Sequence, residues 1–570
     1  MIYKSHLPDI RVPENLTLWS WLLDSSHSCL AQSPASQVQG FTDATTGEHM
    51  SFSDLRTHTI HLSTTLSRDY GLKEGQVISI FSRNSIWYPV ITLSAVRIGA
   101  VACGVSPDYT VDELAFTLQL SKAQLLFTTK DLKDGAVRAA AKAGIPEKNV
   151  ILLDGESDNT STAPSPLTVR DLIKSGQAYG PNGQTAAYKL PAGKSAAEIC
   201  ALLCFSSGTT GLPKAIMISH SNIMAQCLQI QQITPSDHRR ILAALPFYHI
   251  TGIVHQLHLP ILLNANVYIL PKFTLDGMLE TVARHKIVEM LIVPPILIRI
   301  VREPEVVSKY DLTHVKRFSS GAAPLSREVL DLLEKQFPGT GFKQGYGMTE
   351  SCSAITAHPP SHYSYHYADR VGMAVPSTEV RVVNPDTGKD CATGEAGEVW
   401  ARGPQIAMGY LDNPKATAET FRSDGFLRTG DIGRIDQDGM LRITDRMKEM
   451  IKVKGIGVAP AELENTLLGH PAVKDVAVCG IPDERAGERP KAFVVLKVEP
   501  TSRDEVEAAA RDLIEHVKGN KARHKWVREV EIVESIPKSA AGKILRRKLR
   551  DTSKTSSNVV VKDEPVRAKI

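Results

Sequence analysis

The stretch Ser206-Ser-Gly-Thr-Thr-Gly-Leu-Pro-Lys214 follows the apolar run Ala201–Phe205, which predicts a buried strand. Its glycines let backbone N–H groups point inward together, its hydroxyls add donors, and Lys214 supplies a positive charge. These are the parts of a phosphate-binding loop. It is not the common P-loop, because Leu-Pro separates Gly211 from Lys214 and no Ser or Thr follows the lysine. Taken alone, the stretch is also compatible with a plain loop that joins two strands.

Strands and helices alternate around this loop. Helical patterns occupy Trp87–Arg97 and Val111–Leu120, between apolar runs that predict strands. Such alternation predicts parallel sheets covered by helices on both faces. The further strands are expected at Val77–Ile80, Ala123–Thr128, Val150–Leu153, Val288–Val293 and Val315–Ser319.

Short strands and turns replace this rhythm between Val380 and Ile443. Asn384-Pro-Asp-Thr-Gly388 and Asp436-Gln-Asp-Gly439 are typical of hairpin turns, so a β-rich subdomain is expected here. Downstream of Asp445, two helices and two strands predict a compact α+β unit. They are placed at Pro460–Leu468 and Arg503–Val517, and at Val473–Cys479 and Lys491–Val498.

A chain of 570 residues exceeds what one hydrophobic core supports, so at least two domains are expected. The predicted fold class is α/β. A large N-terminal domain, 1–444, holds two α/β sheets and the β-rich subdomain, and a small α+β C-terminal domain spans 445–550. The polar residues 551–570 are expected to form a flexible tail.

Composition excludes several classes of protein. The net charge of +4 comes without a Lys/Arg stripe, which argues against nucleic-acid binding. The eight cysteines show neither a CxxC pair nor zinc-binding spacing, and the N-terminus lacks the pattern of a secretory signal. Ile241–Leu270 contains no Asp, Glu, Lys or Arg, but prolines, histidines and asparagines interrupt it. A buried core or pocket wall is therefore expected there, not a membrane span.

Further motifs follow the loop in order. They are Gly321-Ala-Ala-Pro324, Gln344-Gly-Tyr-Gly-Met-Thr-Glu350, Arg428-Thr-Gly-Asp431, Asp445-Arg-Met-Lys448 and Pro537-Lys-Ser-Ala-Ala-Gly-Lys543. With them the chain, from about Thr17 to Leu549, resembles the adenylate-forming superfamily and its branch of 4-coumarate:CoA ligases, fatty acyl-CoA synthetases and beetle luciferases. The resemblance implies an ATP-dependent acyl-CoA ligase. Such an enzyme activates a small-molecule carboxylic acid with Mg-ATP to acyl-AMP, and transfers the acyl group to coenzyme A after its mobile C-terminal domain has rotated.

The resemblance implies roles in binding phosphate and metal. Thr209, Thr210 and Lys214 hold the β- and γ-phosphates, Thr349 meets the α-phosphate, and Glu350 holds Mg²⁺. A carboxylate with phosphate oxygens is a suitable ligand set for that hard cation. Further implied ATP contacts in these motifs are Ser206, Ser207, Gly208, Ala322, Gln344 and Gly345.

Four residues are implied around the nucleoside and the reacting centre. Tyr346 lies against adenine, Asp431 accepts the ribose hydroxyls, and Arg446 lies near the ribose. Lys543 matches the catalytic lysine, whose ammonium suits the negative charge that spreads over phosphate and carboxylate oxygens in the transition state. Without the motifs, each of the three charged residues would be interpreted as a solvated surface charge.

Phe247-Tyr-His249-Ile-Thr-Gly252 matches the segment that borders the acyl carboxylate, and His249 is counted among the catalytic residues with Thr349, Glu350 and Lys543. The alternative for His249 is a core histidine that is satisfied by a backbone carbonyl. Ile241–Leu270 offers no carboxylate to a substrate ammonium, which favours an uncharged acyl tail. The other expected wall residues are Thr251, His255, Ser320, Gly321, Gly345, Ala354, Lys448 and Lys452.

The stretch 445–455 resembles the hinge between the domains, with Lys448 as its pivot. Lys452, Lys454 and Gly455 would face the active site after rotation, and Lys272, Lys454 and Gly455 are implied contacts of coenzyme A. Two positions depart from the family pattern. Ala215 stands where glycine is usual, and Gly457 stands where glutamine is more typical.

Rival functions remain open from the sequence. They are a stand-alone adenylation enzyme that loads a carrier protein, a non-catalytic nucleotide or acyl binder, and a luciferase-like oxygenase. Aryl-propenoic, phenylacetic and medium-chain acids all remain candidate substrates. The ending Ala568-Lys569-Ile570 resembles the signal that the peroxisomal import receptor binds. A peroxisomal location is therefore expected, with the cytoplasm as the alternative.

Overall fold

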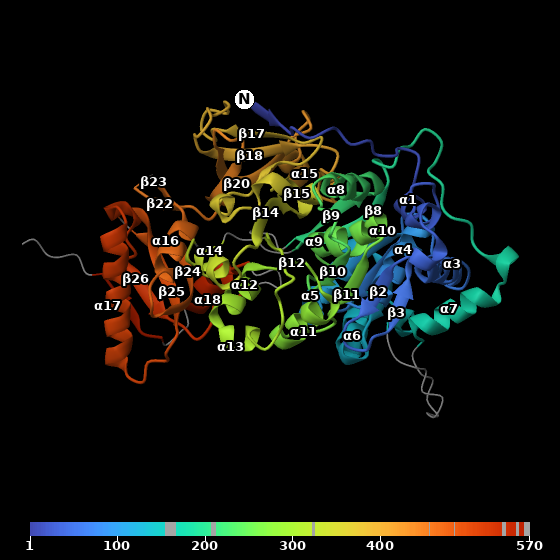
Figure 1. Cartoon of the computed structure of the whole chain (residues 1–570), viewed down its shortest axis with the longest axis horizontal. Helices are drawn as coiled ribbons and strands as arrows, with labels where there is room; N and C mark the ends of the chain where they lie inside the picture. The colour runs from blue at the N-terminus through green and yellow to red at the C-terminus, as the bar shows by residue number, and fades with distance from the viewer. Residues whose placement is uncertain are drawn as a thin grey trace, which may run out of the picture.

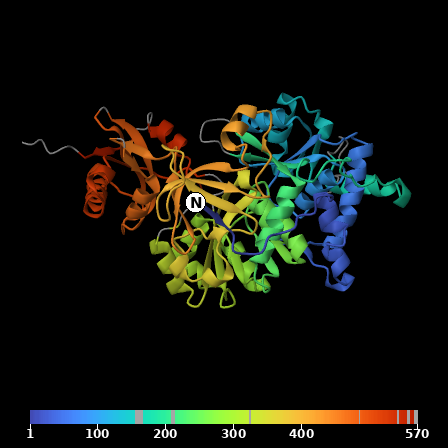
Figure 2. The same cartoon turned by 90° about the horizontal axis from the view of Figure 1, so that it is seen from above.

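The computed structural model describes residues 1–153, 167–206, 213–321, 325, 327–454, 456–483, 485–538, 543–553 and 558–563. A large body and a small C-terminal domain are visible in Figure 1, and Figure 2 shows the same division from above. In both views the small domain lies at one end of the body. The α/β fold class predicted from the sequence is confirmed.

A seven-stranded sheet carries the phosphate-loop motif. Its strands run in the order β19 (Gly409–Tyr410), β9 (Lys214–Ser219), β8 (Cys200–Ser206), β5 (Val101–Val105), β4 (Val77–Phe81), β6 (Ala123–Thr128) and β7 (Val150–Leu152). The five strands from β8 to β7 are parallel, and β9 turns back antiparallel to β8. The predicted strands and helices of this region are confirmed to within about one or two residues.

Helices of this sheet form where the sequence supplies caps and apolar surface. Helix α5 (Val111–Ser121) begins at a capping box, in which the Thr110 side chain accepts from the N–H of Glu113 and the Glu113 carboxylate accepts in return. Every residue of α4 (Trp87–Arg97) is buried, which explains why its sequence is apolar on all sides. Helix α3 (Phe52–Arg68) packs against α4 and α7 (Val169–Ala178).

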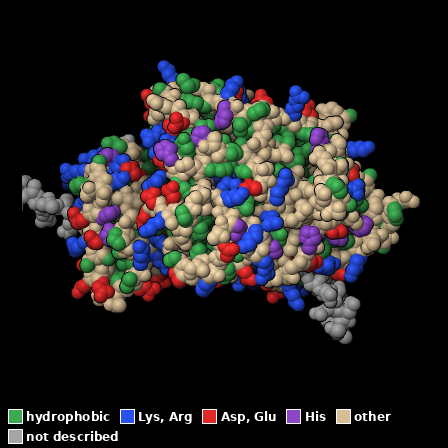
Figure 3. All heavy atoms as spheres, viewed as in Figure 1, with side chains coloured by type: hydrophobic (Ala, Val, Ile, Leu, Met, Phe, Trp, Pro, Cys, Tyr) green, Lys and Arg blue, Asp and Glu red, His purple; other side chains and the backbone are tan. Residues whose placement is uncertain are grey.

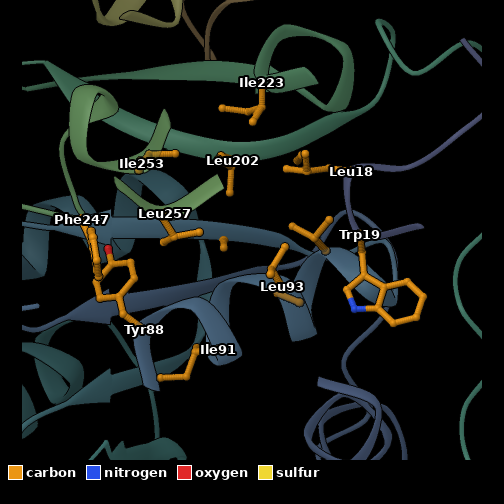
Figure 4. Packing of buried hydrophobic residues seen from close by; sticks show 14 of the residues in the cluster. Leu18, Trp19, Tyr88, Ile91, Leu93, Leu202, Ile223, Phe247, Ile253 and Leu257 are labelled. Atoms are coloured by element: carbon orange, nitrogen blue, oxygen red, sulfur yellow. The ribbon is translucent and has the colours of Figure 1, made fainter. Parts of the chain in front are cut away.

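The largest hydrophobic core joins segments that are distant in sequence. Figure 4 shows Leu18 and Trp19 of α1 (Leu18–Leu23), Leu93 of α4, and Leu257 of the π-helix η5 (Ile253–His258) around Leu202 of β8. The uncharged stretch 241–270 contributes many residues to this core. Its elements are the end of β10 (Arg240–Ala243), α9 (Ile250–Gly252), η5, α10 (Leu259–Leu263) and β11 (Asn266–Ile269). Within the described ranges, no helix combines the length and apolar character needed to cross a membrane.

Two more sheets complete the α/β part. One has four strands, in the order β10, β11, β2 (Gly40–Asp43) and β3 (His49–Ser51). The other has five, in the order β12 (Glu289–Leu291), β13 (Arg317–Ser320), β14 (Gly341–Met348), β15 (Ser353–Ala357) and β16 (Met373–Ala374). Helices α11 (Leu275–His285), α12 (Pro294–Arg302) and α14 (Arg327–Gln336) bury their apolar sides in the core of this second sheet.

The expected β-rich subdomain is an antiparallel sheet with an unexpected edge strand. Its order is β1 (Ile2–Lys4), β17 (Glu379–Val383), β18 (Gly397–Arg402), β20 (Leu427–Ile435) and β21 (Leu441–Arg446). Both predicted turns are present, with Gly388 and Gly439 at positive φ angles of 68° and 77°. The N-terminal strand β1 pairs with β17, a pairing that the sequence did not indicate.

The small domain has a hydrophobic core of its own. Strand β25 (Gly487–Leu496) is central, and pairs with β24 (Val473–Asp483), β22 (Ile451–Val453) and β26 (Glu529–Ile532). Strand β23 (Ile456–Val458) pairs with β22. Helices α16 (Pro460–Leu468) and α17 (Arg503–Asn520) bury apolar residues in this core, and α18 (Arg546–Ser553) follows the Lys543 motif.

One expectation about the C-terminus needs correction. Part of the interval 551–570 is not a flexible tail, because α18 ends within it and β27 (Val560–Lys562) pairs with β26. Val561 is buried in the small-domain core, and Asp563 forms ion pairs with Lys518 and Arg528. The last residues, Ala568-Lys569-Ile570, lie outside the described residues.

The surface fits the nearly balanced charge of the chain. The sequence has 66 Lys and Arg against 62 Asp and Glu, and Figure 3 shows the two signs interspersed over the face in view. This face carries no stripe of one sign that would attract a nucleic-acid backbone.

Candidate active site

The two ends of the phosphate-loop motif lie on paired strands. Ser206 ends β8 and pairs with Lys214, the first residue of β9. Lys214 Nζ lies 4.6 Å from the centroid of the Tyr410 ring, so the ring faces the ammonium at the base of the loop. Ser207, Gly208, Thr209 and Thr210 fall outside the described residues, as do Ala322 and Gly455.

Glu350 is held next to this lysine by the same tyrosine. It belongs to the short helix η6 (Thr349–Ser351), and the Tyr410 hydroxyl donates to its Oε1 at 2.8 Å. Only 5% of Glu350 is exposed, and this burial raises the pKa of its carboxyl, while Tyr410, Arg446 and Lys214 lower it. Thr349 precedes it on η6.

The described residues could bind Mg²⁺ with Glu350 as the protein ligand. The described residues contain no group of three or more His, Cys, Asp or Glu side chains that could hold a metal ion. A magnesium ion at Glu350 would therefore take most of its ligands from phosphate oxygens and water, which is how this cation is commonly bound.

Three elements meet at Asp431. The Tyr346 hydroxyl, on β14, donates to Asp431 Oδ2 at 2.7 Å, and Arg446 Nε on β21 lies 3.4 Å from Oδ1. The carboxylate is 5% exposed, and the Asp431 pKa is raised by burial, although Arg446 opposes this. Burial and the nearby carboxylate keep the pKa of Tyr346 well above its usual value, so the phenol stays a donor.

Lys543 is a residue of the small domain that interacts with Asp431 and Arg446. Burial lowers the pKa of its ammonium to about 8; the positive charge of Arg446 adds to the shift, and Glu449 and Asp431 oppose it. Lys543 is near enough to Asp431 and Arg446 for their charges to shift its pKa, so it lies in the neighbourhood of this group. Arg302 Nη1 of α12 also donates to the carbonyl of Lys474 at 2.7 Å, which is a second contact between the domains.

The residues proposed for the acyl pocket lie on or next to α9, η5 and strands β13 to β15. Burial lowers the pKa of His249 to about 4, so its ring is neutral near pH 7. His255 Nε2 lies 3.2 Å from Ser353 Oγ, and Thr251 is partly exposed on α9. A π-helical turn such as η5 is uncommon and often occurs at functional sites.

Two glycines expected in the pocket wall lie close together beside β13 and β14. A Cβ added to Gly321 would lie 3.5 Å from the carbonyl oxygen of Gly345, so the two glycines are close neighbours. The buried Ser320 Oγ has no hydrogen-bond partner among the described residues, and so could bind a ligand. The Ala354 N–H, by contrast, is already bound to Gln226 Oε1 at 2.5 Å.

The lysines predicted for the hinge and for binding coenzyme A do not join the buried residues around Asp431. Lys448, Lys452, Lys454 and Lys272 are all exposed. Lys454 has a positive φ of 51°, an uncommon angle for a residue with a side chain, and its N–H bonds to the carbonyl of Ala486 at 2.7 Å. In this arrangement, Lys543 occupies the site instead.

Sequence reasoning missed two groups that support the site. Tyr410 contacts both Glu350 and Lys214, but an isolated tyrosine before Asn413-Pro414 gives no signal of this. Arg546, three residues after Lys543, forms ion pairs with Glu449 and, at 2.7 Å, with Glu464. These pairs anchor the segment after Lys543 to Glu449 in the hinge stretch and to Glu464 on α16.

Comparisons with known proteins identify the family of this chain. The family model for the AMP-binding enzyme matches residues 31–411, and that for the AMP-binding enzyme C-terminal domain matches 462–543. Probable CoA ligase CCL5 of Humulus lupulus is 35% identical over 512 residues, which is 89% of each chain. Peroxisomal OPC-8:0-CoA ligase 1 of Arabidopsis thaliana is 34% identical over 522 residues, 91% of each chain.

A solved structure shares the fold over nearly its whole length. ATP-bound MatB from Rhodopseudomonas palustris has a TM-score of 0.79 at 26% identity, covering 95% of this chain and 99% of that one. The chain therefore belongs to the adenylate-forming family of AMP-binding enzymes, and within it to the ATP-dependent, AMP-forming acid–CoA ligases.

Proposed function

We propose that the enzyme catalyses two steps at one site. We further propose that the domain orientation described above is the one that catalyses the first step, adenylate formation. A substrate carboxylate oxygen forms a bond to the α-phosphorus of ATP, and the bond from that phosphorus to the bridging oxygen breaks, releasing pyrophosphate. The observation that carries this proposal is the position of Lys543. The Lys543 ammonium interacts electrostatically with Asp431 on β20 and Arg446 at the end of β21, where it could neutralise developing negative charge.

The other residues divide between binding and orientation. Asp431 would accept the ribose hydroxyls, with Tyr346 fixing its carboxylate and lying against the base. Glu350 would hold Mg²⁺, which supplies positive charge to the phosphate oxygens. Lys214 stands at the base of the loop in which Thr209 and Thr210 would bind the β- and γ-phosphates. His249, neutral near pH 7, would border the carboxylate without pairing with it as a cation.

The second step needs a different orientation of the small domain. The thiol sulfur of coenzyme A attacks the acyl carbon, and AMP leaves as the bond from that carbon to the phosphate oxygen breaks. Rotation about Lys448 would withdraw Lys543 and bring Lys452, Lys454 and Gly455 to the site, while Lys272 contacts coenzyme A. The exposure of Lys448, Lys452 and Lys454 in the present orientation is consistent with this exchange.

Pyrophosphate release from Mg-ATP tests the proposal across aromatic and aliphatic acids, each with and without coenzyme A. We expect slow release with a suitable acid alone, and faster release with formation of a thioester when coenzyme A is added. Release that is indifferent to coenzyme A, but supports loading of a carrier protein, would contradict the ligase proposal.

We also propose a peroxisomal location and the import receptor as a partner, on the basis of Ala568-Lys569-Ile570. One relative is named as peroxisomal. A fluorescent fusion that leaves the C-terminus free should colocalise with a peroxisomal marker, and removal of the tripeptide should leave it in the cytoplasm. The same distribution with and without the tripeptide would overturn this assignment.

A further inference from the structure

The chain reverses direction just after Glu350, and two residues of this turn have unusual backbone angles. Cys352 has a φ of 49° and Ser353 a φ of 97°. Neither is a glycine, so each positive φ costs conformational energy and persists only where the surroundings enforce it. The turn joins η6, which carries Thr349 and Glu350, to β15. Its conformation therefore affects where those two side chains point.

Close contacts within the turn show how tightly it is folded. On β14, a Cβ added to Gly347 would lie only 1.6 Å from the carbonyl oxygen of Ser353. The Ser351 hydroxyl oxygen lies 3.1 Å from the carbonyl oxygen of Met348 and 2.9 Å from that of Ser353, and it accepts from the Met348 N–H at 3.0 Å. These contacts all join residues of the turn to one another, so they do not tie it to the surrounding core.

A buried glutamine of α8 (His220–Gln232) supplies a tie from outside the turn. Gln226 Oε1 accepts from the N–H of Ala354, the residue after Ser353, at 2.5 Å. The register of β14 against β15 shifts at Gly347, which is the residue paired with Ala354. The glutamine side chain therefore binds the backbone where the ladder between these strands is irregular.

Two further amides hold the Gln226 side chain in place. Gln226 Nε2 donates to Gln229 Oε1 at 2.9 Å, and Gln229 Nε2 donates to Gln405 Oε1 at 3.0 Å and to the carbonyl of Pro376 at 2.8 Å. All three glutamines are fully buried. Because a backbone N–H can only donate, the atom that faces Ala354 must be the amide oxygen, and the amide nitrogen is left for Gln229. Each amide thus fixes the orientation of the next.

We propose that Gln226 is a positioning residue for adenylate formation. Its hydrogen bond to Ala354 holds Ser353 at a positive φ. This conformation of the turn keeps Thr349 and Glu350 directed at the place where Mg-ATP binds. The inference rests on the roles proposed above for these two residues.

Gln226→Met removes both hydrogen bonds of the amide and nearly preserves the length of the side chain. We expect pyrophosphate release without coenzyme A to fall by about ten- to a hundredfold, as for other groups that orient a metal ligand. Binding of Mg-ATP without an acid, measured by calorimetry, should weaken by about tenfold. Thr65→Val removes a buried 2.6 Å hydrogen bond to the Leu172 carbonyl, between α3 and α7, and should leave both values unchanged. Wild-type rate and binding in Gln226→Met would contradict the proposal.

The backbone angle of Ser353 provides a test that a merely structural role would not pass. In the Gln226→Met background, Ser353→Gly should raise the rate of adenylation by about three- to tenfold, because glycine adopts a positive φ without a steric cost. Ser353→Ala removes the same hydroxyl, which lies 3.2 Å from His255 Nε2, but keeps the Cβ and should raise nothing. Equal effects of glycine and alanine would overturn the inference.

Two further comparisons keep the outcomes distinct. If thermal melting shows that Gln226→Met does not fold, Gln226→Asn takes its place, since this amide is one methylene too short to bind both Ala354 and Gln229; the same losses are expected. If Glu350→Gln leaves adenylation and its magnesium dependence unchanged, the proposed function of Glu350 fails. If Glu350→Gln lowers adenylation but the Gln226 variants do not, only the positioning role of Gln226 fails.

Discussion

Replacement of Lys543 by alanine is expected to slow adenylate formation by roughly a hundred- to thousandfold, the usual cost of removing one transition-state charge partner. Thioester formation from presynthesised acyl-AMP should change by less than about threefold, because that step is made in the other domain orientation. The two half-reactions can be measured separately, by pyrophosphate release without coenzyme A and by thioester formation without ATP. Equal losses in both would show that the variant damages the fold or a common step.

The pH profile gives an independent check on the same residue. Only the ammonium form of Lys543 can neutralise negative charge, and its pKa in the free enzyme is about 8. Adenylation measured as kcat/KM should therefore decline as pH rises above about 8. Bound phosphates favour the charged form, so the decline in kcat should come at higher pH. Lys543→Arg stays protonated throughout this range and should lose the decline, even if its rate is lower.

Replacement of Glu350 by glutamine is expected to lower adenylation by roughly a hundredfold at ordinary magnesium concentrations, since it removes the charge that would bind the metal but nearly preserves the shape. Higher Mg²⁺ should restore part of the rate, so the concentration for half-maximal activity rises. The measurement is the initial rate of pyrophosphate release against Mg²⁺ at fixed acid and ATP.

Tyr410→Phe is the matched control for this variant. It keeps the Glu350 carboxylate and the aromatic ring beside Lys214, and removes the phenol hydroxyl with its 2.8 Å hydrogen bond to Glu350 and its bond to Thr420. A loss of about tenfold is expected, as for other groups that orient a metal ligand. If Glu350→Gln kept the wild-type magnesium dependence, Glu350 could not be the metal ligand.

Local features of the site follow from sequence, whereas its long-range contacts do not. The loop between β8 and β9 was predictable because an apolar run precedes a Gly/Ser/Thr stretch. Tyr346 and Asp431 are 85 residues apart, and only the folded chain places the phenol at the carboxylate. The position of Lys543 depends further on how two domains are oriented, and no residue pattern encodes that orientation by itself.

The features that the sequence analysis did not predict also depend on contacts between distant parts of the chain. Val559, Val560 and Val561 are too few to show a strand period within a polar tail, but β26 offers an unpaired edge to them. The buried pairs around Glu289 join residues that look like ordinary surface charges in the sequence.

Strand β1 has a consequence for how the chain folds during synthesis. The Met1 ammonium lies 2.7 Å from Asp390 Oδ2, and the two residues are 389 positions apart along the chain. At roughly 5–20 residues per second, the ribosome needs roughly 20–80 s to supply this partner. Strand β1 therefore waits for β17 long after its own synthesis, and until then it is an unpaired strand that a chaperone or a neighbouring nascent chain could bind.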